Sequence, residues 1–320
     1  RSTQSRSSAA SDVYKRQLMG LPVRLVPVQP ENSNPSSGIA VIETLAIYFF
    51  KLKGKNDFKE WILNISMGIF SYPVNGIFAF ITIGALFWAK EFQIYTFPLT
   101  LSALVLCFIL DDLTFYLHHR ICHRWRWGWG LHRTHHSSER MGIDVGARQP
   151  FTKHFTGTRM LKIPLVIIGF DPLMILFCVF INGYYQYLCH TQTIYKLPRW
   201  YEYLFNTPSH HRVHHARNPK YLDANYAGTL MIWDRMFGTF VPEDPKEPCD
   251  YGLVVPMTSL NPLRILFEEY ANIFKDITMR GITLKDRFMY LCGPPGWSHD
   301  GTRKTSTEIK EDYYNVIKNT

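Results

Sequence analysis

Four long apolar blocks constrain the fold of this 320-residue chain more than any other feature. They cover residues 39–50, 61–89, 97–117 and 163–189. A run of about 20 apolar residues can cross the hydrocarbon core of a bilayer as a helix. Inside that core every backbone polar group must be hydrogen-bonded within the protein, which favours helices over open strands. Aromatic residues crowd the block ends, as is typical of membrane–water boundaries. The blocks therefore predict an all-α integral membrane protein.

Breaks within and between the blocks predict how the helices are connected. The block at 61–89 is long enough to span the bilayer with tilt or a kink, and it forms a hairpin with the block at 97–117. The fourth block is interrupted at Gly169-Phe170-Asp171-Pro172. Because proline cannot continue a regular helix, we expect these four residues to form the tip of a short or re-entrant hairpin.

The placement of basic residues predicts the orientation. Lysines follow the first block, and the positive-inside rule assigns them to the cytosol. Arginines follow the third block on the same side. The lysines are Lys51, Lys53, Lys55 and Lys59, and the arginines are Arg120, Arg124, Arg126, Arg133, Arg140 and Arg148. We therefore expect helical hairpins that carry a cytosolic helical cap, in the endoplasmic reticulum or, in a bacterium, in the inner membrane.

The net charge of +9 fits loops that face anionic lipid headgroups. No basic stripe with a nucleic-acid fold signature is present, so no nucleic-acid partner is expected. The six cysteines stand singly without a C-x-x-C pair and are interpreted as reduced, buried residues.

The start of the chain is set apart from the rest. Residues 12–17 read as a translated transposase adapter, and the serine-rich run before them has no structural pattern. We expect residues 1–17 to be a non-native leader. Residues 18–320 are predicted to form a single membrane-embedded domain with its functional core at about 100–245.

Three histidine clusters supply the chemistry. They are His119 and His123, then His132, His135 and His136, and finally His211, His214 and His215. Residues three and four apart share one face of a helix, so each cluster is expected to point two or three imidazoles into one small volume. Eight imidazoles exceed the needs of one ion, which favours two metals sharing a site. Imidazole ligation suits iron, zinc, copper or nickel rather than magnesium or calcium.

Four other histidines are not expected to bind metal. His118 and His210 adjoin cluster members but face another direction on a helix, and His154 and His299 stand alone.

Two aspartates are candidates for orienting the imidazoles. Asp112 lies seven residues before His119, two turns back on one helix face, and it could accept the outer N–H of a ligating ring. Asp234 could do the same for the third cluster. The alternatives are an ion pair with Arg120 or solvation for Asp112, and an ion pair with a nearby arginine for Asp234. Neither aspartate is assigned as a general acid or base.

Strings around the third cluster carry a family resemblance. Residues 206–215 read NTPSHHRVHH, residues 223–228 read DANYAG, and residues 233–240 read WDRMFGTF. DYGL at 250–253 and GPPGW at 293–297 occupy comparable places in the tail. Over about residues 100–300 the chain resembles the fatty acid hydroxylase and sterol desaturase superfamily of membrane di-iron oxygenases. Within it, the strings are most similar to the branch that cleaves ether lipids.

The resemblance implies a ligand set and a reaction. The three clusters match the histidine boxes of the family, and His190 matches an additional family histidine that binds metal. Two iron ions, O₂ and a membrane lipid substrate are implied, with hydroxylation of the carbon next to the ether oxygen of an alkylglycerol.

The resemblance also implies an external reductant, because the chain has no dinucleotide fingerprint and no fused haem segment. The ether-lipid branch draws on tetrahydrobiopterin and its relatives on cytochrome b5. This chain departs from the branch at Arg124, where close relatives have Glu, and at Gly142, where Asn is usual.

Other functions stay open at this point. A sterol C-4 methyl oxidase or a fatty-acyl hydroxylase would use the same metal cage. A zinc-dependent membrane hydrolase is disfavoured because no box contains a Glu as in H-E-x-x-H. A non-enzymatic metal- or lipid-binding membrane protein is a third alternative. The sequence leaves the oligomeric state open.

Overall fold

The computed structural model describes residues 58–150, 158–257 and 259–319, and these residues form helices and loops without a strand. The all-α prediction is confirmed for them. The expected leader at 1–17, the first apolar block at 39–50, most of the lysine-rich turn and His154 lie outside the described residues.

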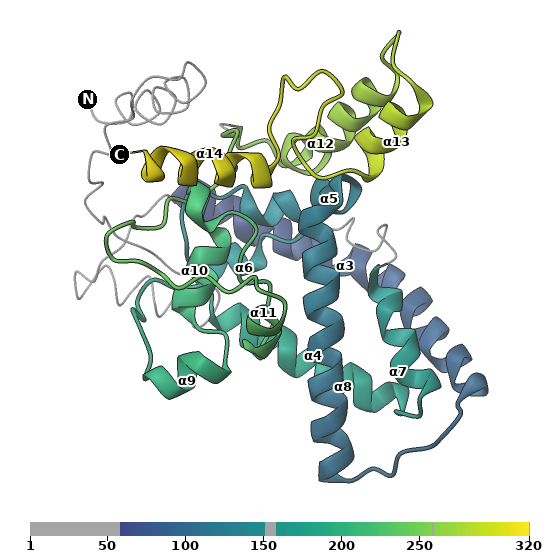
Figure 1. Ribbon diagram of the computed structural model, residues 1–320. Helices are drawn as coiled ribbons and strands as arrows, with labels where there is room; N and C mark the ends of the chain where they lie inside the picture. Colours follow the sequence, from purple (N-terminus) through teal and green to yellow (C-terminus); the bar gives the residue numbers. More distant parts are fainter. Residues whose placement is uncertain (1–57, 151–157, 258, 320) are drawn as a thin grey trace. The chain divides into compact units, whose positions relative to one another are not determined.

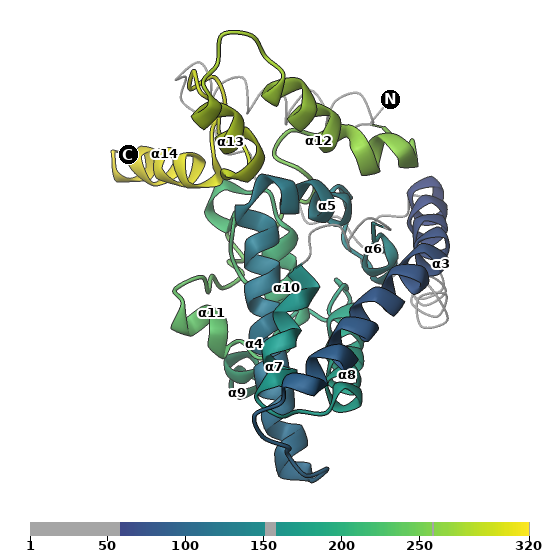
Figure 2. The same cartoon turned by 90° about the vertical axis from the view of Figure 1, so that its right-hand side faces the viewer.

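Two long apolar helices follow one another near the start of the described residues. Helix α3 covers Phe58–Ala89 and contains Pro73, and helix α4 covers Leu101–Arg124. Two segments, Pro73–Phe92 and Leu101–Arg124, are long and apolar enough to cross a membrane by length and composition. Figures 1 and 2 show the chain leaving along α3 and returning along α4.

The fourth apolar block is broken where the sequence predicts. The short 3-10 helix η3 (Thr158–Lys162) leads into α7 (Ile163–Ile167), and α8 begins at Pro172 and ends at Leu188. Gly169 has a φ of +127°, and a Cβ there would lie 2.5 Å from the Tyr95 carbonyl oxygen. Only glycine adopts this conformation readily, so Gly169 and Pro172 together end one helix and begin the next.

An apolar core joins the long helices to the two halves of the fourth block. Its buried side chains come from α3, α4, α7 and α8 and include Leu86, Cys107, Val166, Phe170 and Ile175. Cys107 and Cys178 belong to this core, and all six cysteines are free thiols, as expected. Cys249 and Cys292 are only partly buried, so the expectation of burial holds for four of the six.

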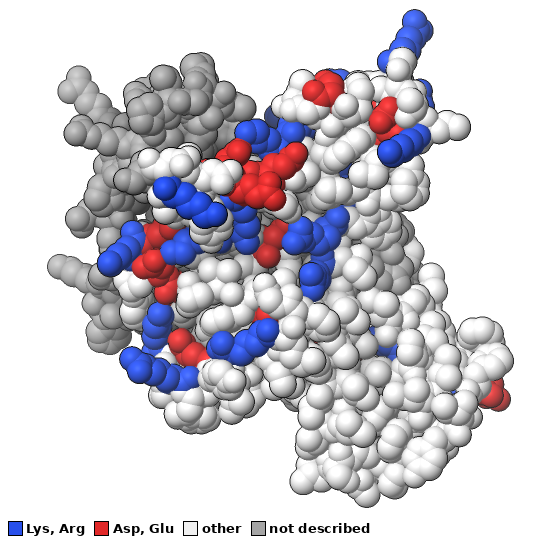
Figure 3. Space-filling model, viewed as in Figure 1, with Lys and Arg blue, Asp and Glu red and all other residues white. Residues whose placement is uncertain are grey.

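The remaining helices of the described residues are shorter. They are α5 (Arg126–His136), α6 (Ile143–Ala147), α9 (Arg199–Leu204), α10 (Pro208–His215), η4 (Pro219–Tyr221), α11 (Ile232–Met236), α12 (Pro262–Ile277), α13 (Leu284–Cys292) and α14 (Ser306–Lys318). Helix α12 packs on α5 through ion pairs from Arg126 to Glu269 and from Arg133 to Glu268. In Figure 3 charged side chains gather over α9, α10 and α12 to α14, whereas few appear over the lower part of α4 and α8.

Candidate metal centre

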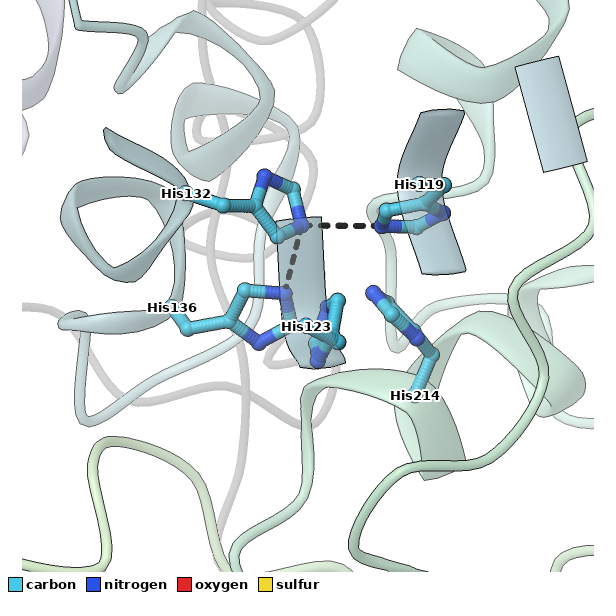
Figure 4. Close-up of side chains that lie close together, drawn as sticks. All are labelled: His119, His123, His132, His136 and His214. Carbon is cyan, nitrogen blue, oxygen red and sulfur yellow. Dashed lines mark hydrogen bonds between the residues drawn. The ribbon is translucent and has the colours of Figure 1, made fainter. Parts of the chain in front are cut away.

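Five histidines from three helices form one compact group. His119 and His123 come from α4, His132 and His136 from α5, and His214 from α10. One ligand nitrogen of each ring lies within 4.8 Å of those of the others, and Figure 4 shows the rings facing a common centre. The Nε2 atom of His132 lies 2.8 Å from that of His119 and 3.1 Å from that of His136.

Four further histidines form a second group beside the first. They are His135, His190, His211 and His215, and their ligand nitrogens also lie within 4.8 Å of one another. His190 Nε2 lies 3.0 Å from His135 Nε2 and 2.9 Å from His211 Nε2. The rings of His136 and His215 stack at 4.3 Å, so the five-histidine group and the four-histidine group are in contact.

The two H-x-x-H-H strings divide their histidines between the groups. His132 and His136, four residues apart, join the five-histidine group, while His135 turns to the other. In α10 the pair four apart, His211 and His215, joins the four-histidine group and His214 the five-histidine group. Two members of each string thus lie in one small volume, within the two or three that the spacing predicts. Each string also sends its third imidazole to the other volume, because consecutive residues such as His135 and His136 lie about 100° apart around a helix.

The nitrogen separations and burial suit metal ligation. Two nitrogens bound at right angles to one ion at about 2.1 Å would lie about 3 Å apart, close to the separations observed here. The Nε2 atoms of His123, His214 and His215 are buried and have no hydrogen-bond partner among the described residues. A bound ion would satisfy these nitrogens, which would otherwise be costly to bury.

Burial also holds the rings in the protonation state that binds metal. It lowers the pKa of His190 to about 4 and the pKa values of the remaining ligand candidates on α5 and α10 well below the usual range. Those candidates are His132, His135, His136, His211, His214 and His215. Neutral imidazole is the form that coordinates a metal ion.

Backbone carbonyls orient two rings of the five-histidine group. His119 Nδ1 lies 2.8 Å from the Tyr226 carbonyl oxygen, and His214 Nδ1 lies 2.9 Å from that of Ala224. These N–H donations leave the Nε2 atoms as ligands. The residues before these two carbonyls, Asp223 and Asn225, have positive φ values of 51° and 55°. Asp and Asn adopt this left-handed conformation more easily than other non-glycine residues, which explains the D-x-N pattern.

Asp112 and Asp234 hold this carbonyl-bearing segment, residues 223–230, instead of contacting a ring. Asp112 accepts hydrogen bonds from the backbone N–H groups of Thr229 and Leu230, and also from the Trp233 indole and the Asn182 amide. Asp234 accepts from the N–H groups of Tyr226 and Ala227 and from the Thr239 hydroxyl, as shown by separations of 2.8, 2.7 and 2.6 Å.

The expected contacts from these two aspartates to an imidazole are thus not formed among the described residues, and neither are the alternative ion pairs. The two carboxylates instead bind the backbone of residues 226–230, in the segment whose Ala224 and Tyr226 carbonyls contact the rings. Gly228 completes the arrangement, because a Cβ there would lie 2.7 Å from Asp112 Oδ1 and 2.6 Å from Asn182 Oδ1.

Asp223 is the carboxylate that the sequence reasoning missed. Its Oδ1 lies 3.6 Å from His123 Nδ1, and its Oδ2 lies 3.5 Å from Arg124 Nη1. Burial alone would raise the pKa of Asp223, but the interactions with His123 and Arg124 outweigh burial and lower it. Asp223 is the first residue of the DANYAG string, and this position was the signal in the sequence that could have identified it. The string was not considered as a source of ring contacts because it lies in a loop, outside the helices that carry the histidines.

Three of the histidines excluded as ligands lie within the described residues, and all three are outside both groups. His118 contacts Cys122, and His210 packs on Phe240. His299 is hydrogen-bonded to Tyr290, with 2.6 Å between His299 Nδ1 and the Tyr290 hydroxyl oxygen. Gly142 is the N-cap of α6 and Arg124 lies 3.3 Å from the Thr307 hydroxyl, so the two positions that depart from the family pattern are placed outside the ligand groups.

A buried arginine fixes the helix that carries the second box. Arg148 donates to the Thr134 carbonyl, to the Ser137 hydroxyl and to Asn64 on α3. Burial lowers the pKa of Arg148 to about 10, so it stays charged at neutral pH. These bonds tie the C-terminal end of α5 to α3, and Gly146 on α6 lets Tyr187 and His190 approach closely.

Comparison with known proteins agrees with this geometry. The family model described as fatty acid hydroxylase matches residues 104–239, a range that contains all nine grouped histidines. The alkylglycerol monooxygenase of Xenopus tropicalis is 38% identical over 192 residues, which cover 60% of this chain and 42% of that protein. The human alkylglycerol monooxygenase is 30% identical over 276 residues, which cover 85% of this chain and 61% of that protein.

A bacterial protein is also similar. The ornithine lipid hydroxylase OlsE of Rhizobium tropici is 26% identical over 166 residues, covering 52% of this chain and 47% of that protein. The chain thus spans only part of the length of the curated relatives it matches. No solved structure matches. The resemblance predicted from the motif strings is confirmed.

Proposed function

We propose that the protein is an O₂-dependent membrane lipid monooxygenase that cleaves the ether bond of alkylglycerols, because the fatty acid hydroxylase family model matches residues 104–239. The observation that carries this proposal is the pair of adjoining histidine groups, five and four rings, inside the matched range. The similar alkylglycerol monooxygenases support the choice of substrate.

Two iron ions are the proposed cofactors, one in each group. Iron supplies O₂ activation for attack on an unactivated C–H bond, which zinc cannot supply because it has no redox chemistry. The described residues would contribute the nine imidazoles as ligands. Their burial excludes water, and the carbonyl oxygens of Ala224 and Tyr226 hold two rings in orientation.

The proposed reaction balances with an external two-electron donor. One oxygen atom of O₂ becomes a hydroxyl on the carbon next to the ether oxygen, and the other is reduced to water with two electrons and two protons. The resulting hemiacetal collapses, its C–O bond to glycerol breaks, and a fatty aldehyde and glycerol are released. Tetrahydrobiopterin is the proposed donor and cytochrome b5 the alternative.

A membrane location fits both the substrate and the helices. The candidate spans Pro73–Phe92 and Leu101–Arg124 carry exposed apolar side chains such as Phe80 and Leu101. A lipid substrate could enter sideways from the bilayer. We propose that the histidine groups face the cytosol, as the basic loops favour, and that the membrane is the endoplasmic reticulum or a bacterial inner membrane.

A lipid hydroxylase that leaves the backbone of its substrate intact is the second candidate. The similarity to the ornithine lipid hydroxylase of Rhizobium tropici favours this candidate. In such a reaction the two histidine groups would act on a carbon that is not bonded to an ether oxygen.

The test is turnover of an alkylglycerol by membranes that contain the full chain, with O₂ and each reductant supplied separately. We expect one fatty aldehyde for each O₂ consumed with tetrahydrobiopterin, no turnover by His135→Ala, and turnover by His299→Ala. A hydroxylated lipid without aldehyde would establish the second candidate. A chain that binds iron but consumes no O₂ with any lipid or reductant would contradict both.

A further inference from the structure

A polar pocket lies at the N-terminal end of α10, on residues that neither histidine group uses. Its volume is about 160 Å³, several times that of a water molecule. The pocket is lined by Lys196, Arg199, Glu202, Tyr203, Ser209, His210, Arg235, Phe240, Pro242 and Glu243.

The charges around this pocket favour an anion. Three cations face two carboxylates, and one of these, Glu243, is already paired with Arg212 at 2.7 Å. The other carboxylate, Glu202, accepts hydrogen bonds from the Leu197 N–H and the Thr207 hydroxyl. Both carboxylates are therefore neutralised or occupied by the protein itself. Arg199 is exposed and forms no ion pair or hydrogen bond among the described residues.

Two buried polar atoms in the pocket wall call for a partner. The Ser209 hydroxyl and His210 Nδ1 form no hydrogen bond among the described residues, although these residues are only 1% and 3% exposed. Burying such atoms without a partner is unfavourable. His210 Nδ1 is therefore free to accept a hydrogen bond from a ligand, and the Ser209 hydroxyl is free to donate one. The wall thus offers a hydroxyl donor beside an acceptor.

The helix and its surroundings add two further reasons. The N-terminus of α10 has the positive end of its helix dipole at the pocket, and helix N-termini bind phosphate groups. The adjoining helix α9 exposes Trp200 and Tyr203 by 65% and 61%, and Arg235 packs over the Phe240 ring at 3.9 Å. Exposed aromatic residues next to cations are typical of surfaces at the lipid headgroup level.

We propose that this pocket binds a phosphate ester that carries a free hydroxyl, such as the phosphoglycerol part of a lipid headgroup. Arg199, Arg235 and Lys196 would face the phosphate oxygens, the Ser209 hydroxyl would donate to one of them, and His210 Nδ1 would accept from the ligand hydroxyl. This binding site is separate from the histidine groups, and it does not depend on the proposed oxygenase reaction.

The test is calorimetric titration of the iron-loaded full chain in detergent. The probes are glycerol 3-phosphate, dihexanoyl-phosphatidylglycerol and, as the phosphate-free control, dihexanoylglycerol. The variants are Arg199→Gln and Ser209→Ala. Arg264→Gln is the matched control because Arg264 is exposed on α12, where it pairs with Glu268 outside the pocket. Iron content, measured in parallel, shows that each variant has folded.

We expect both variants to bind the phosphate probes about tenfold more weakly, because each loses a hydrogen bond to a charged group. Arg264→Gln should bind as the unaltered chain does. Tight binding of the phosphatidylglycerol alone assigns the site to a lipid headgroup, and tight binding of glycerol 3-phosphate alone assigns it to a soluble phosphate ester. Equal binding of dihexanoylglycerol, equal weakening in Arg264→Gln, or no phosphate binding would overturn the proposal.

Discussion

The five-histidine group and the four-histidine group differ in what lies behind their rings. In the first, the outer nitrogens of His119 and His214 meet carbonyls from residues 223–230, a segment about 100 residues after α4 in the chain. In the second, His190 Nδ1 lies 2.9 Å from the carbonyl oxygen of Gln186 in the last turn of α8, and His135 Nδ1 lies 3.4 Å from Gln149 Nε2. One group depends on a distant segment, and the other on local contacts.

This difference assigns separate tasks to the polar residues near the site. Asp112, Asp234 and Gly228 all hold the distant segment, so their loss should affect the five-histidine group first. Among the described residues, Asp223 is the one carboxylate that forms an ion pair with a histidine of either group, namely His123. The four-histidine group is held through helix packing and through Arg148 behind α5. The following predictions test whether the two groups can be perturbed one at a time.

Loss of a ligand should have the largest effect. His214→Ala removes a ring from the five-histidine group and His211→Ala one from the four-histidine group. We expect each to reduce kcat/KM by more than about a hundredfold, since even residues behind metal ligands are worth 10–100-fold. His299→Ala, outside both groups, should keep its activity. Full activity of either ligand variant would show that its group is not needed.

Asp112→Asn should have the next largest effect. The asparagine amide keeps one acceptor oxygen, but its NH₂ group replaces the other. This NH₂ group would face N–H donors that now bind the Asp112 carboxylate, such as the Leu230 backbone and the Trp233 indole. We expect a loss of about 3 kcal/mol in the free energy of unfolding and 10–100-fold in activity. The matched control is Asp111→Asn, because Asp111 pairs with Lys162 and does not contact residues 223–230. Equal activity losses in the two variants would show that Asp112 acts only on α4.

Two glycine substitutions should separate the groups by a smaller amount. In Gly228→Ala the new Cβ meets Asp112 and Asn182, whereas in Gly146→Ala it meets the Tyr187 ring at 2.7 Å. We expect each to cost about 1–3 kcal/mol of stability by overpacking. Gly228→Ala should weaken metal binding only in the five-histidine group. Metal titration monitored by visible absorption checks this, and identical titration curves for the two variants would contradict it.

Asp223→Asn should have the smallest effect of the four. The amide can still face His123 but carries no charge, so we expect about tenfold weaker metal binding in the five-histidine group. Gln149→Ala is the corresponding change behind His135, and its effect should be within twofold because the 3.4 Å contact is long. A larger effect of Gln149→Ala than of Asp223→Asn would reverse the assignment of distant and local support.

The sequence predicts the helices better than their ends. Apolar content marked the third block as ending at 117, whereas α4 continues to Arg124 through His119 and His123. A helix is continued by its backbone hydrogen bonds, which do not require apolar side chains. The break at Gly169 and Pro172 was predictable because glycine permits the positive φ that ends one helix and proline cannot continue a regular helix.

The candidate ligands were predictable from the sequence, but their division into groups was not. Spacing shows that His132 and His136 share a helix face, yet only the packing of α4, α5 and α10 decides that His214 joins them. The partners behind the rings were not predictable because they are carbonyls of Ala224 and Tyr226, which no side chain identifies. Asp112 and Asp234 were expected to contact imidazoles, but they accept hydrogen bonds from backbone N–H groups of residues 226–230.

The central claim, two metal sites built from separate histidine groups, is tested most directly by counting iron atoms per chain. The measurement is elemental analysis of the purified full chain, of His214→Ala, of His211→Ala and of the double variant, each loaded with iron under the same conditions. We expect about two iron atoms in the unaltered chain, about one in each single variant and none in the double variant. One iron atom in the unaltered chain, or complete loss in both single variants, would contradict the two-site account.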